Sequence, residues 1–227
     1  MQARCARMSW HPMWEDSYRR RDWGRYPPQE VVRFVARHCY SMQERCAVRI
    51  LDLGDGRGTG ASWFIACEGF ALAGIDAFPT AIAKAQERFA SEGLKANFRL
   101  GAIDRLPWSD ASFDAVIDIV CLAHNSEQAS AVIIEQIHRV LKPGGRHFSL
   151  TPKAGCWGDG SGERVGATTR RNVDKGPFAG RGKARFATEA SLRQLCARFR
   201  ELKIGLGVRS IDSRRHEIGH WAVTCSN

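Results

Sequence analysis

The 227-residue sequence has no uninterrupted apolar run near the ~18 residues that a membrane-spanning helix needs, so we expect no membrane span. Its first residues lack the apolar stretch and small-residue cleavage site of a secretory signal peptide, which favours a cytoplasmic protein. Eight cysteines are present, but no two have the CxxC spacing, and none is spaced with histidine as in a zinc finger. We therefore expect reduced, mostly buried cysteines and no metal site.

The central part of the chain also lacks the positive charge that the rest carries. The formal net charge is +10, yet residues 50–151 alone carry −3. Residues 1–49, 152–186 and 187–227 carry +5, +5 and +3. This distribution predicts a local anionic partner rather than a uniformly basic particle.

Short apolar runs alternate with amphipathic stretches through most of the chain. The predicted strands are residues 47–54, 71–76, 96–100, 113–120 and 146–151. The predicted helices are residues 29–40, a stretch from the glycine loop at 54–60 to about Glu68, and residues 80–93 and 127–141. After the insertion, the sequence predicts a helix capped by Thr188 and then two strands, at 201–206 and 217–225. The alternation predicts an α/β fold with βαβ units around a parallel sheet that is covered on both faces.

We expect a single domain over residues 1–227, built in four parts. Residues 1–46 are the predicted N-terminal cover, 47–151 the ligand-binding core, 152–186 an insertion, and 187–227 a C-terminal helix and strand pair. The stretch 153–186 has eight glycines and weak periodicity, so we predict a long loop and no second hydrophobic core. Loops of this length inside compact domains are usually functional lids or disordered segments.

The most informative segment is Leu51-Asp52-Leu53-Gly54-Asp55-Gly56-Arg57-Gly58-Thr59-Gly60. Glycines at alternate positions after a strand allow a tight turn and a close approach of the backbone to a ligand. The N-terminus of the following helix offers free N–H groups and the positive end of the helix dipole. The loop alone also fits the loose GxGxxA pattern of dinucleotide enzymes. Asp52 separates the two interpretations, because a carboxylate there can meet the ammonium group of a methionine moiety.

This segment resembles motif I (D/E-x-G-x-G-x-G) of class I S-adenosylmethionine (SAM)-dependent methyltransferases, and is most similar to the small-molecule branch with the ubiquinone- and menaquinone-biosynthesis enzymes. RLPWSDASFDAVID at 105–118 is similar to the family's LPFxDxSFDxV stretch, and RVLKPGGRHFSLT at 139–151 to its RVLKPGG turn. The resemblance covers roughly residues 47–151. It implies a Rossmann-like, seven-stranded, mostly parallel sheet with helices on both faces, an N-terminal helical cover and a Gly/Arg-rich lid insertion.

The resemblance also implies which residues bind SAM or its product, S-adenosylhomocysteine (SAH). Asp76 ends the second strand, eighteen residues after Gly58, where an acid accepts hydrogen bonds from the ribose hydroxyls. Relatives commonly have Gly-Asp-Ala where this chain has Gly101-Ala102-Ile103, so the adenine contact passes to Asp104 or to the backbone of Ile103. The full predicted set is Asp52, Gly54, Gly56, Gly58, Asp76, Ala77, Ala102, Ile103, Asp104 and Ile119.

Candidate residues on the acceptor side follow the fourth strand, whose carboxyl end faces the methyl group in this fold. His124 is the candidate general base, with helix capping as the alternative, and Asn125 is a candidate substrate contact. The aromatic candidates Trp14, Tyr18 and Tyr26 would stack on a substrate ring or seal the cofactor. The arginine candidates Arg170 and Arg171 would clamp a carboxylate or phosphate, or lie in a solvated loop.

The predicted function is transfer of a methyl group from SAM to an O or N atom of a small, anionic acceptor, with no metal. Nucleic acid is not expected as a partner, because the sequence has no appended RNA-binding module and no Asn-Pro-Pro-Tyr motif. Methylation of RNA or protein remains an alternative, as does non-catalytic SAM binding, which the absent acid at position 102 suggests. The sequence specifies neither the acceptor nor the oligomeric state.

Overall fold

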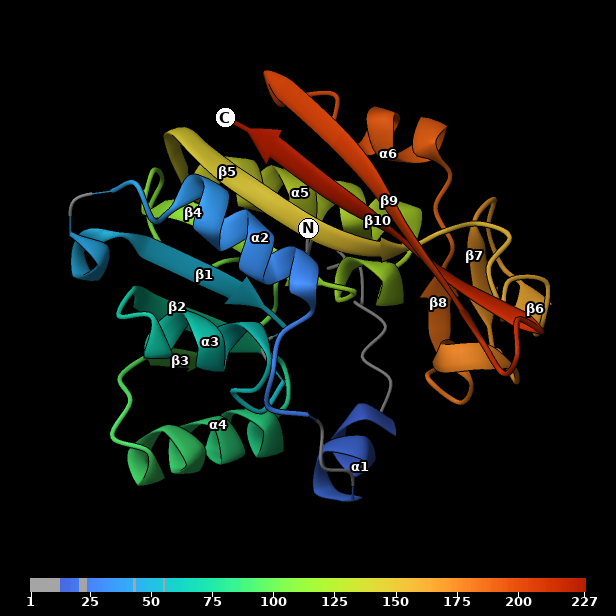
Figure 1. Ribbon diagram of the computed structural model, residues 1–227, viewed down its shortest axis with the longest axis horizontal. Coiled ribbons are helices and arrows are strands. Elements are labelled where there is room, and N and C mark those ends of the chain that lie inside the picture. The colour runs from blue at the N-terminus through green and yellow to red at the C-terminus, as the bar shows by residue number, and fades with distance from the viewer. Residues whose placement is uncertain (1–12, 21–23, 43, 55) are drawn as a thin grey trace, which may run out of the picture.

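The computed structural model describes residues 13–20, 24–42, 44–54 and 56–227 (Figure 1). Its helices are α1 (Met13–Arg20), α2 (Gln29–His38), α3 (Ala61–Cys67), α4 (Pro79–Ser91), α5 (Glu127–Val140) and α6 (Glu189–Leu195). The 3-10 helices are η1 (Arg45–Ala47), η2 (Leu122–His124) and η3 (Gly176–Phe178). The main strands are β1 (Arg49–Leu53), β2 (Ala71–Asp76), β3 (Asn97–Leu100), β4 (Phe113–Ile119), β5 (Leu141–Pro152), β9 (Glu201–Ile211) and β10 (His216–Ser226).

These strands form one seven-stranded sheet in the order β3-β2-β1-β4-β5-β10-β9 (Figure 1). The first five strands are parallel, and β10 is antiparallel to both β5 and β9. The predicted seven-stranded, mostly parallel α/β sheet is therefore confirmed. The strand order reverses at β1, which lies between β2 and β4, and ligands of open α/β sheets bind beyond the carboxyl ends of strands at such a point.

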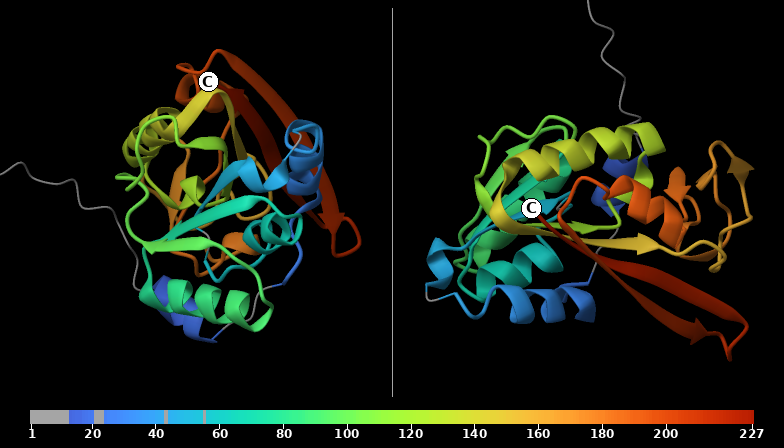
Figure 2. Two further views of the ribbon diagram at one scale, coloured as in Figure 1. Left: turned by 90° about the vertical axis from the view of Figure 1, so that its left-hand side faces the viewer. Right: turned by 90° about the horizontal axis from the view of Figure 1, so that it is seen from above.

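Helices cover both faces of the sheet (Figure 2), and each face has its own hydrophobic cluster. On one face, α2 and α3 contribute Val31, Phe34 and Ile65 to a cluster with residues of β1, β2 and β5. On the other face, Ile133 and Ile137 of α5 pack with Leu192 of α6. The amphipathic stripes of these helices are buried as their sequence periodicity predicts.

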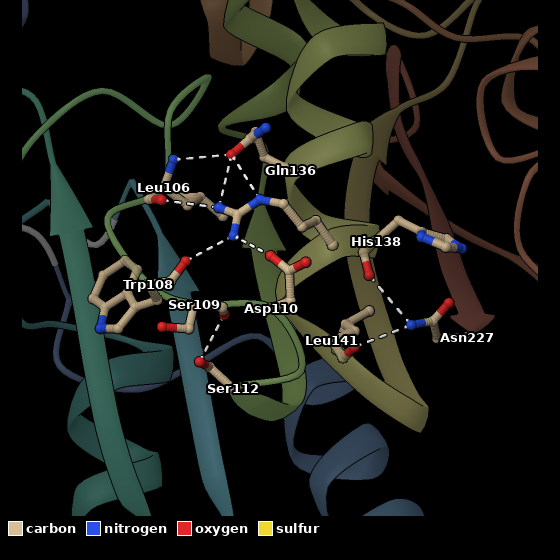
Figure 3. Close-up of polar contacts among 10 residues, drawn as sticks. Leu106, Trp108, Ser109, Asp110, Ser112, Gln136, His138, Leu141 and Asn227 are labelled. Atoms are coloured by element: carbon tan, nitrogen blue, oxygen red, sulfur yellow. Dashed lines mark hydrogen bonds and ion pairs between the residues drawn. The ribbon is translucent and has the colours of Figure 1, made fainter.

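The segment that carries the second family-like stretch is held by one arginine of α5. Arg139 donates hydrogen bonds to the backbone oxygens of Leu106 and Trp108, at 2.9 and 2.8 Å, and forms an ion pair with Asp110 at 2.8 Å. Figure 3 shows Leu106, Trp108 and Asp110 on the segment beside α5, and Gln136 reaching toward them. Asp110 is therefore a structural partner of α5, and the segment after β3 is fixed against the sheet.

Strand β5 differs from its predicted extent. We predicted a turn at Lys142-Pro143-Gly144-Gly145 before a strand at 146–151, whereas β5 runs through these residues from Leu141. Its register against β4 shifts between Phe113 and Ala115, where Gly144 has a φ of +75°. A glycine tolerates this left-handed conformation, so the turn is absorbed as an irregularity within a paired strand.

The insertion also differs from the predicted long loop. It contains a small antiparallel sheet of β6 (Glu163–Arg164), β7 (Thr169–Arg171) and β8 (Lys183–Arg185), which lies beside the main sheet (Figure 1). Cys156, Val173, Phe178, Ala184 and Phe186 form its own small buried cluster, so the prediction of no second core is wrong. These apolar residues are too irregularly spaced to give a periodic signal, because glycine turns separate them.

The predicted N-terminal cover is described only in part, since residues 1–12, 21–23 and 43 lie outside the described ranges. Within the described part, α1 packs on α4: Lys84 Nζ donates to the Tyr18 backbone oxygen at 2.8 Å, and Glu15 pairs with Thr80. None of the described helices is both long enough and apolar enough to cross a membrane.

Candidate active site

A cavity of about 380 Å³ lies at the carboxyl ends of β1, β2 and β4. Its walls come from α1, from the ends of these three strands and the loops after them, from the segment after β3, from the insertion and from β10. The lining residues are Trp14, Tyr18, Gly54, Asp76, Ala77, Phe78, Ile103, Ile119, Val120, Cys121, His124, Asn125, Pro177, Phe178, Arg181 and His220. Its volume lies within the ~300–1,000 Å³ range of small-molecule sites.

Two glycines of the loop after β1 have no room for a side chain. Gly54 has a φ of +64°, and a Cβ there would lie 2.4 Å from the Sγ of Cys121. Gly58 has a φ of +63°, and a Cβ there would lie 2.9 Å from the Phe89 ring. Only glycine combines this backbone conformation with such close neighbours, which explains the glycines at these two positions. Gly54 lines the cavity directly.

Asp76, at the end of β2, lines the cavity and is only 3% exposed. Its Oδ2 accepts a hydrogen bond from Gly56 N–H at 2.9 Å and from the Tyr18 hydroxyl at 3.4 Å, and its Oδ1 accepts one from Phe78 N–H at 3.0 Å. Burial raises the pKa of Asp76 to about 6, and these hydrogen bonds act in the opposite direction. The carboxylate therefore connects the glycine loop, the loop after β2 and α1.

Asp52 is buried like Asp76 but does not reach the cavity. It is 4% exposed, and its Oδ2 accepts a hydrogen bond from the Ser62 hydroxyl at 2.8 Å, near the start of α3. Asp52 is not among the residues that line the cavity. The structure therefore places this carboxylate beneath the glycine loop, where it is tied to the following helix.

His124 projects into the other side of the cavity from η2. Its Nδ1 lies 2.8 Å from the backbone oxygen of Lys183 in β8. A carbonyl can only accept, so Nδ1 carries the proton and Nε2 keeps its lone pair. The ring packs edge-on against Trp14, with centroids 4.7 Å apart, and burial lowers the pKa of His124 to about 4. His124 is thus a neutral imidazole of defined tautomer at neutral pH.

A buried polar group that sequence reasoning missed holds η2 in place. Asp118 of β4 is fully buried; its Oδ1 accepts from Leu122 N–H at 3.0 Å, and its Oδ2 accepts from the Ser149 hydroxyl at 2.6 Å. Burial raises the pKa of Asp118 to about 6, and the Ser149 bond and the charge of nearby Arg185 oppose this shift. The available signal was an acid between apolar residues near the end of the strand, in Val116-Ile117-Asp118-Ile119.

Three comparisons with known proteins agree with this arrangement. Residues 50–145 match the methyltransferase domain family. The chain is 32% identical over 100 residues to methyltransferase GfsG of Streptomyces halstedii, a match that covers 43% of this chain and 35% of that protein. It is 35% identical over 104 residues to a ubiquinone biosynthesis O-methyltransferase of Xylella fastidiosa, covering 45% and 41%. The matches span less than half the length of these two relatives.

The fold extends the similarity beyond the matched segment. A crystal structure of a SAM-dependent methyltransferase from Methanosarcina mazei has a TM-score of 0.65 at 23% identity, covering 86% of this chain and 96% of that chain. Residues 50–145 therefore match a methyltransferase domain, and the chain as a whole shares its fold with a SAM-dependent methyltransferase. The family resemblance seen in the sequence is therefore confirmed.

The cofactor of this family is SAM, and the residues at the cavity fit it. Asp76 offers a buried carboxylate at the end of β2, where the family binds ribose, and the backbone of Gly54 lines the cavity beside it. Of the predicted cofactor contacts, the cavity is lined by Gly54, Asp76, Ala77, Ile103 and Ile119. The others, which lie outside its lining, are Asp52, Gly56, Gly58, Ala102 and Asp104. Among the described residues no group of three or more His, Cys, Asp or Glu side chains could hold a metal.

The predicted acceptor-side residues divide into two groups. Trp14, Tyr18 and Asn125 line the cavity. Tyr26 does not: it is 77% exposed and contacts Trp63 edge-on, with ring centroids 5.5 Å apart. The prediction that Tyr26 contacts the substrate is inconsistent with this placement, because its ring faces Trp63 and solvent.

Arg170 and Arg171, the two predicted arginines, do not line the cavity, whereas a third arginine does. Arg170 pairs with Asp159 at 3.2 Å and Arg171 with Glu163 at 2.6 Å, so both are engaged by acids of the insertion and lie outside the cavity lining. Arg181, from the same insertion, lines the cavity instead. Sequence reasoning also missed Cys121, Pro177, Phe178 and His220. Nothing in the local sequence distinguishes Arg181 from the other arginines of the insertion, since their partners are set by how it folds.

Proposed function

We propose that this chain transfers a methyl group from SAM to a small-molecule acceptor. The observation that carries the proposal is one continuous cavity with Asp76 and Gly54 in one part of its lining and the uncharged imidazole of His124 in another. The first part matches the family's cofactor contacts, and the second offers a proton acceptor. The match of residues 50–145 to methyltransferase domains supports the same activity.

On the cofactor side, the Asp76 carboxylate would accept hydrogen bonds from the ribose hydroxyls. The backbone around Gly54 would lie against the methionine part, with Asp52 supplying negative charge from beneath. Ile103 and Ile119 would enclose the adenine between apolar surfaces. When bound, SAM supplies a methyl group that its positively charged sulfur activates. The protein's own task is to orient the acceptor and to exclude water.

On the acceptor side, His124 would receive the proton of an attacking hydroxyl or amine at Nε2. The Lys183 carbonyl holds Nδ1, so the ring is fixed in the tautomer that an acceptor of protons requires. Because its pKa is about 4, His124 stays uncharged from weakly acidic to alkaline pH. The name of the Xylella relative, an O-methyltransferase, supports an oxygen nucleophile.

We further infer that the acceptor is anionic. Arg181 contributes a cation to the cavity lining, and Trp14 and Phe178 contribute aromatic surface beside His124. A carboxylate or phosphate of the acceptor would bind the Arg181 guanidinium. This assignment replaces Arg170 and Arg171, which are paired elsewhere in the insertion.

We also propose that α1 and the insertion act as covers of a single catalytic domain. Tyr18 of α1 reaches Asp76, and the Lys183 carbonyl of the insertion reaches His124, so each cover contacts one of these two side chains. Closing a site in this way strengthens its hydrogen bonds by excluding water.

The test combines binding and turnover. SAM or SAH at ~100 times its dissociation constant should add about 2.7 kcal/mol to the unfolding free energy, seen as a raised melting temperature. NAD should give no shift. A labelled-methyl assay against a library of carboxylated and phosphorylated phenols and amines should then show transfer that His124→Asn removes. Absence of a thermal shift with both SAM and SAH would contradict the proposal.

A further inference from the structure

Strand β9 forms one edge of the main sheet. It is eleven residues long, and all eleven pair with β10. Among the described residues no strand pairs with its other side. Figure 2 shows the β9–β10 hairpin reaching past the rest of the sheet. A long free edge of this kind presents a row of unpaired N–H and C=O groups to solvent.

Strand β9 lacks two of the features that commonly block natural edge strands. It has no proline, and it pairs with β10 without a register break. Its charged side chains are Glu201, Lys203 and Arg209, which carry charges of both signs. Leu206 and Val208 are each 49% exposed. They lie on the same face as Leu202 and Ile204, which pack against the hydrophobic core. The apolar stripe thus continues from the core onto the exposed part of the strand.

A second copy of this chain matches the edge better than an unrelated strand does. A two-fold axis that pairs two antiparallel strands runs perpendicular to the sheet and lies midway between the two copies of one residue, so it keeps each face on its own side. With the axis at Gly205, Glu201 of each copy lies opposite Arg209 of the other. The apolar face then pairs Leu202 with Val208 and Ile204 with Leu206.

The neighbouring register is less favourable. With the axis at Leu206, Lys203 of each copy lies opposite Arg209 of the other, which places two like-charged pairs directly across the interface. In the Gly205 register, Lys203 instead lies opposite Gly207, which has no side chain. Charge therefore selects the Gly205 register over the one that would pair all eleven residues.

We propose that two copies of this chain associate by antiparallel pairing of β9 about a two-fold axis at Gly205. The pairing would join the two main sheets into one continuous sheet. It would also stabilise β10, whose His220 lines the cavity and is paired with Gly207. The proposal does not depend on the methyltransferase activity, because no residue of the interface belongs to the cavity lining.

A charge swap tests the interface and its register together. Arg209→Glu alone and Glu201→Arg alone each convert two attractive pairs into two repulsive ones, so each should raise the dimer dissociation constant roughly tenfold or more. The double variant Glu201→Arg with Arg209→Glu restores both pairs and should return close to the parental value. The dissociation constant is measured by sedimentation equilibrium, and the thermal unfolding of each variant confirms that it folds.

The matched control is Arg215→Glu, which makes the same charge change near the hairpin turn on an arginine with a 77% exposed side chain. It should leave the dissociation constant at the parental value. A parental protein that is monomeric at all concentrations up to the millimolar range overturns the proposal. So does a double variant that associates no more strongly than the single variants.

A cysteine placed on the axis gives a second, independent measurement. A Cβ at Gly205 would meet the oxygen and Cβ of Ala222 at 3.8 and 3.9 Å, which are ordinary contacts, so Gly205→Cys should fold. Under mild oxidation with copper phenanthroline, this residue should form a disulfide with its symmetry mate. Trypsin cleaves after Lys203 and Arg209, so the product is the peptide 204–209 linked to itself. Cross-links that involve only the native cysteines would contradict the proposed axis.

Discussion

The backbone oxygen of Lys183 lies 2.8 Å from Nδ1 of His124. This contact joins the insertion to η2 across 59 residues of sequence and determines which nitrogen of the imidazole carries the proton. The insertion is therefore part of the site rather than a surface decoration. Because the partner is a backbone oxygen, the tautomer depends on how β8 is positioned and not on the side chain of Lys183.

The first prediction concerns the pH dependence of the base. His124 has a pKa of about 4 because it is buried, so its neutral form is lost only as the pH falls through about 4. With His124 as the base, the pH profile of kcat/KM should show no fall below pH 6.5 that can be assigned to protonation of this residue. His124→Asn should lower kcat by roughly 10²–10⁴-fold. The measurement is steady-state kinetics between pH 4.5 and 9.

The control for this prediction is His138→Asn, a change in α5 remote from the cavity lining. Its kinetics should be parental. A limb near pH 6.5 that disappears in His124→Asn would show that the imidazole titrates like an exposed histidine and would contradict the described burial.

The second prediction concerns Asp76 and the cofactor. Its carboxylate must be ionised to accept two hydroxyl hydrogen bonds, and burial raises its pKa to about 6. The affinity for SAM should therefore weaken as the pH falls through about 6, approaching a tenfold loss per pH unit below it. Asp76→Ala should weaken binding at pH 8 by about 1.5–3 kcal/mol and remove the pH dependence. Isothermal titration calorimetry at several pH values measures both effects.

The raised pKa of Asp76 also determines whether the stability of the protein rises or falls with pH. Since the pKa of Asp76 is higher in the folded protein than in the unfolded chain, its contribution favours folding most below pH 4 and is lost as the pH rises through about 6. Asp76→Ala should therefore fold, and should be less destabilised at pH 8 than at pH 5. Unfolding in urea at the two pH values gives the comparison. An unfolded variant at pH 8 would contradict this sign.

The third prediction separates the arginines of the insertion. Arg181→Ala should raise the Michaelis constant for an anionic acceptor roughly 10–100-fold and leave SAM affinity nearly unchanged, because Arg181 lines the cavity. The double variant Arg170→Ala with Arg171→Ala serves as the matched control, since these side chains pair with Asp159 and Glu163. It should keep the parental Michaelis constant. If the double variant rather than Arg181→Ala loses affinity for the acceptor, the assignment is wrong.

The fourth prediction concerns the tightest point of the glycine loop. Gly54→Ala would place a Cβ 2.4 Å from Cys121 Sγ in a left-handed conformation, so strain and overpacking together should destabilise the fold by about 2–5 kcal/mol and abolish SAM binding. Gly93→Ala is the control, because Gly93 has a similar φ of +68° and nothing within 4 Å of a Cβ. Its cost should be limited to the conformational strain of about 1–2 kcal/mol. Chemical denaturation measures both. Equal losses in the two variants would mean that the contact with Cys121 does not matter.

The sequence by itself determined the features that depend on local pattern. The alternation of apolar strands and amphipathic helices predicted the order of elements, because the periods of strand and helix are properties of neighbouring residues. The glycine loop was found in the same way, since a tight turn after a strand needs glycine at particular positions. Asp76 was predicted from the family resemblance, Tyr18 as an aromatic residue of the N-terminal segment, and His124 from its place after the fourth strand.

Only the tertiary structure decided which distant side chains meet at the cavity. The partners of Arg170 and Arg171, and the place of Arg181, depend on how the insertion folds around Phe178 and Phe186. Asp118 and Ser149 meet because β4 and β5 are neighbours in the sheet. The free edge of β9 likewise follows from strand order. Such contacts join residues far apart in the chain, and the free energy of burying them together, rather than any local preference, sets their positions.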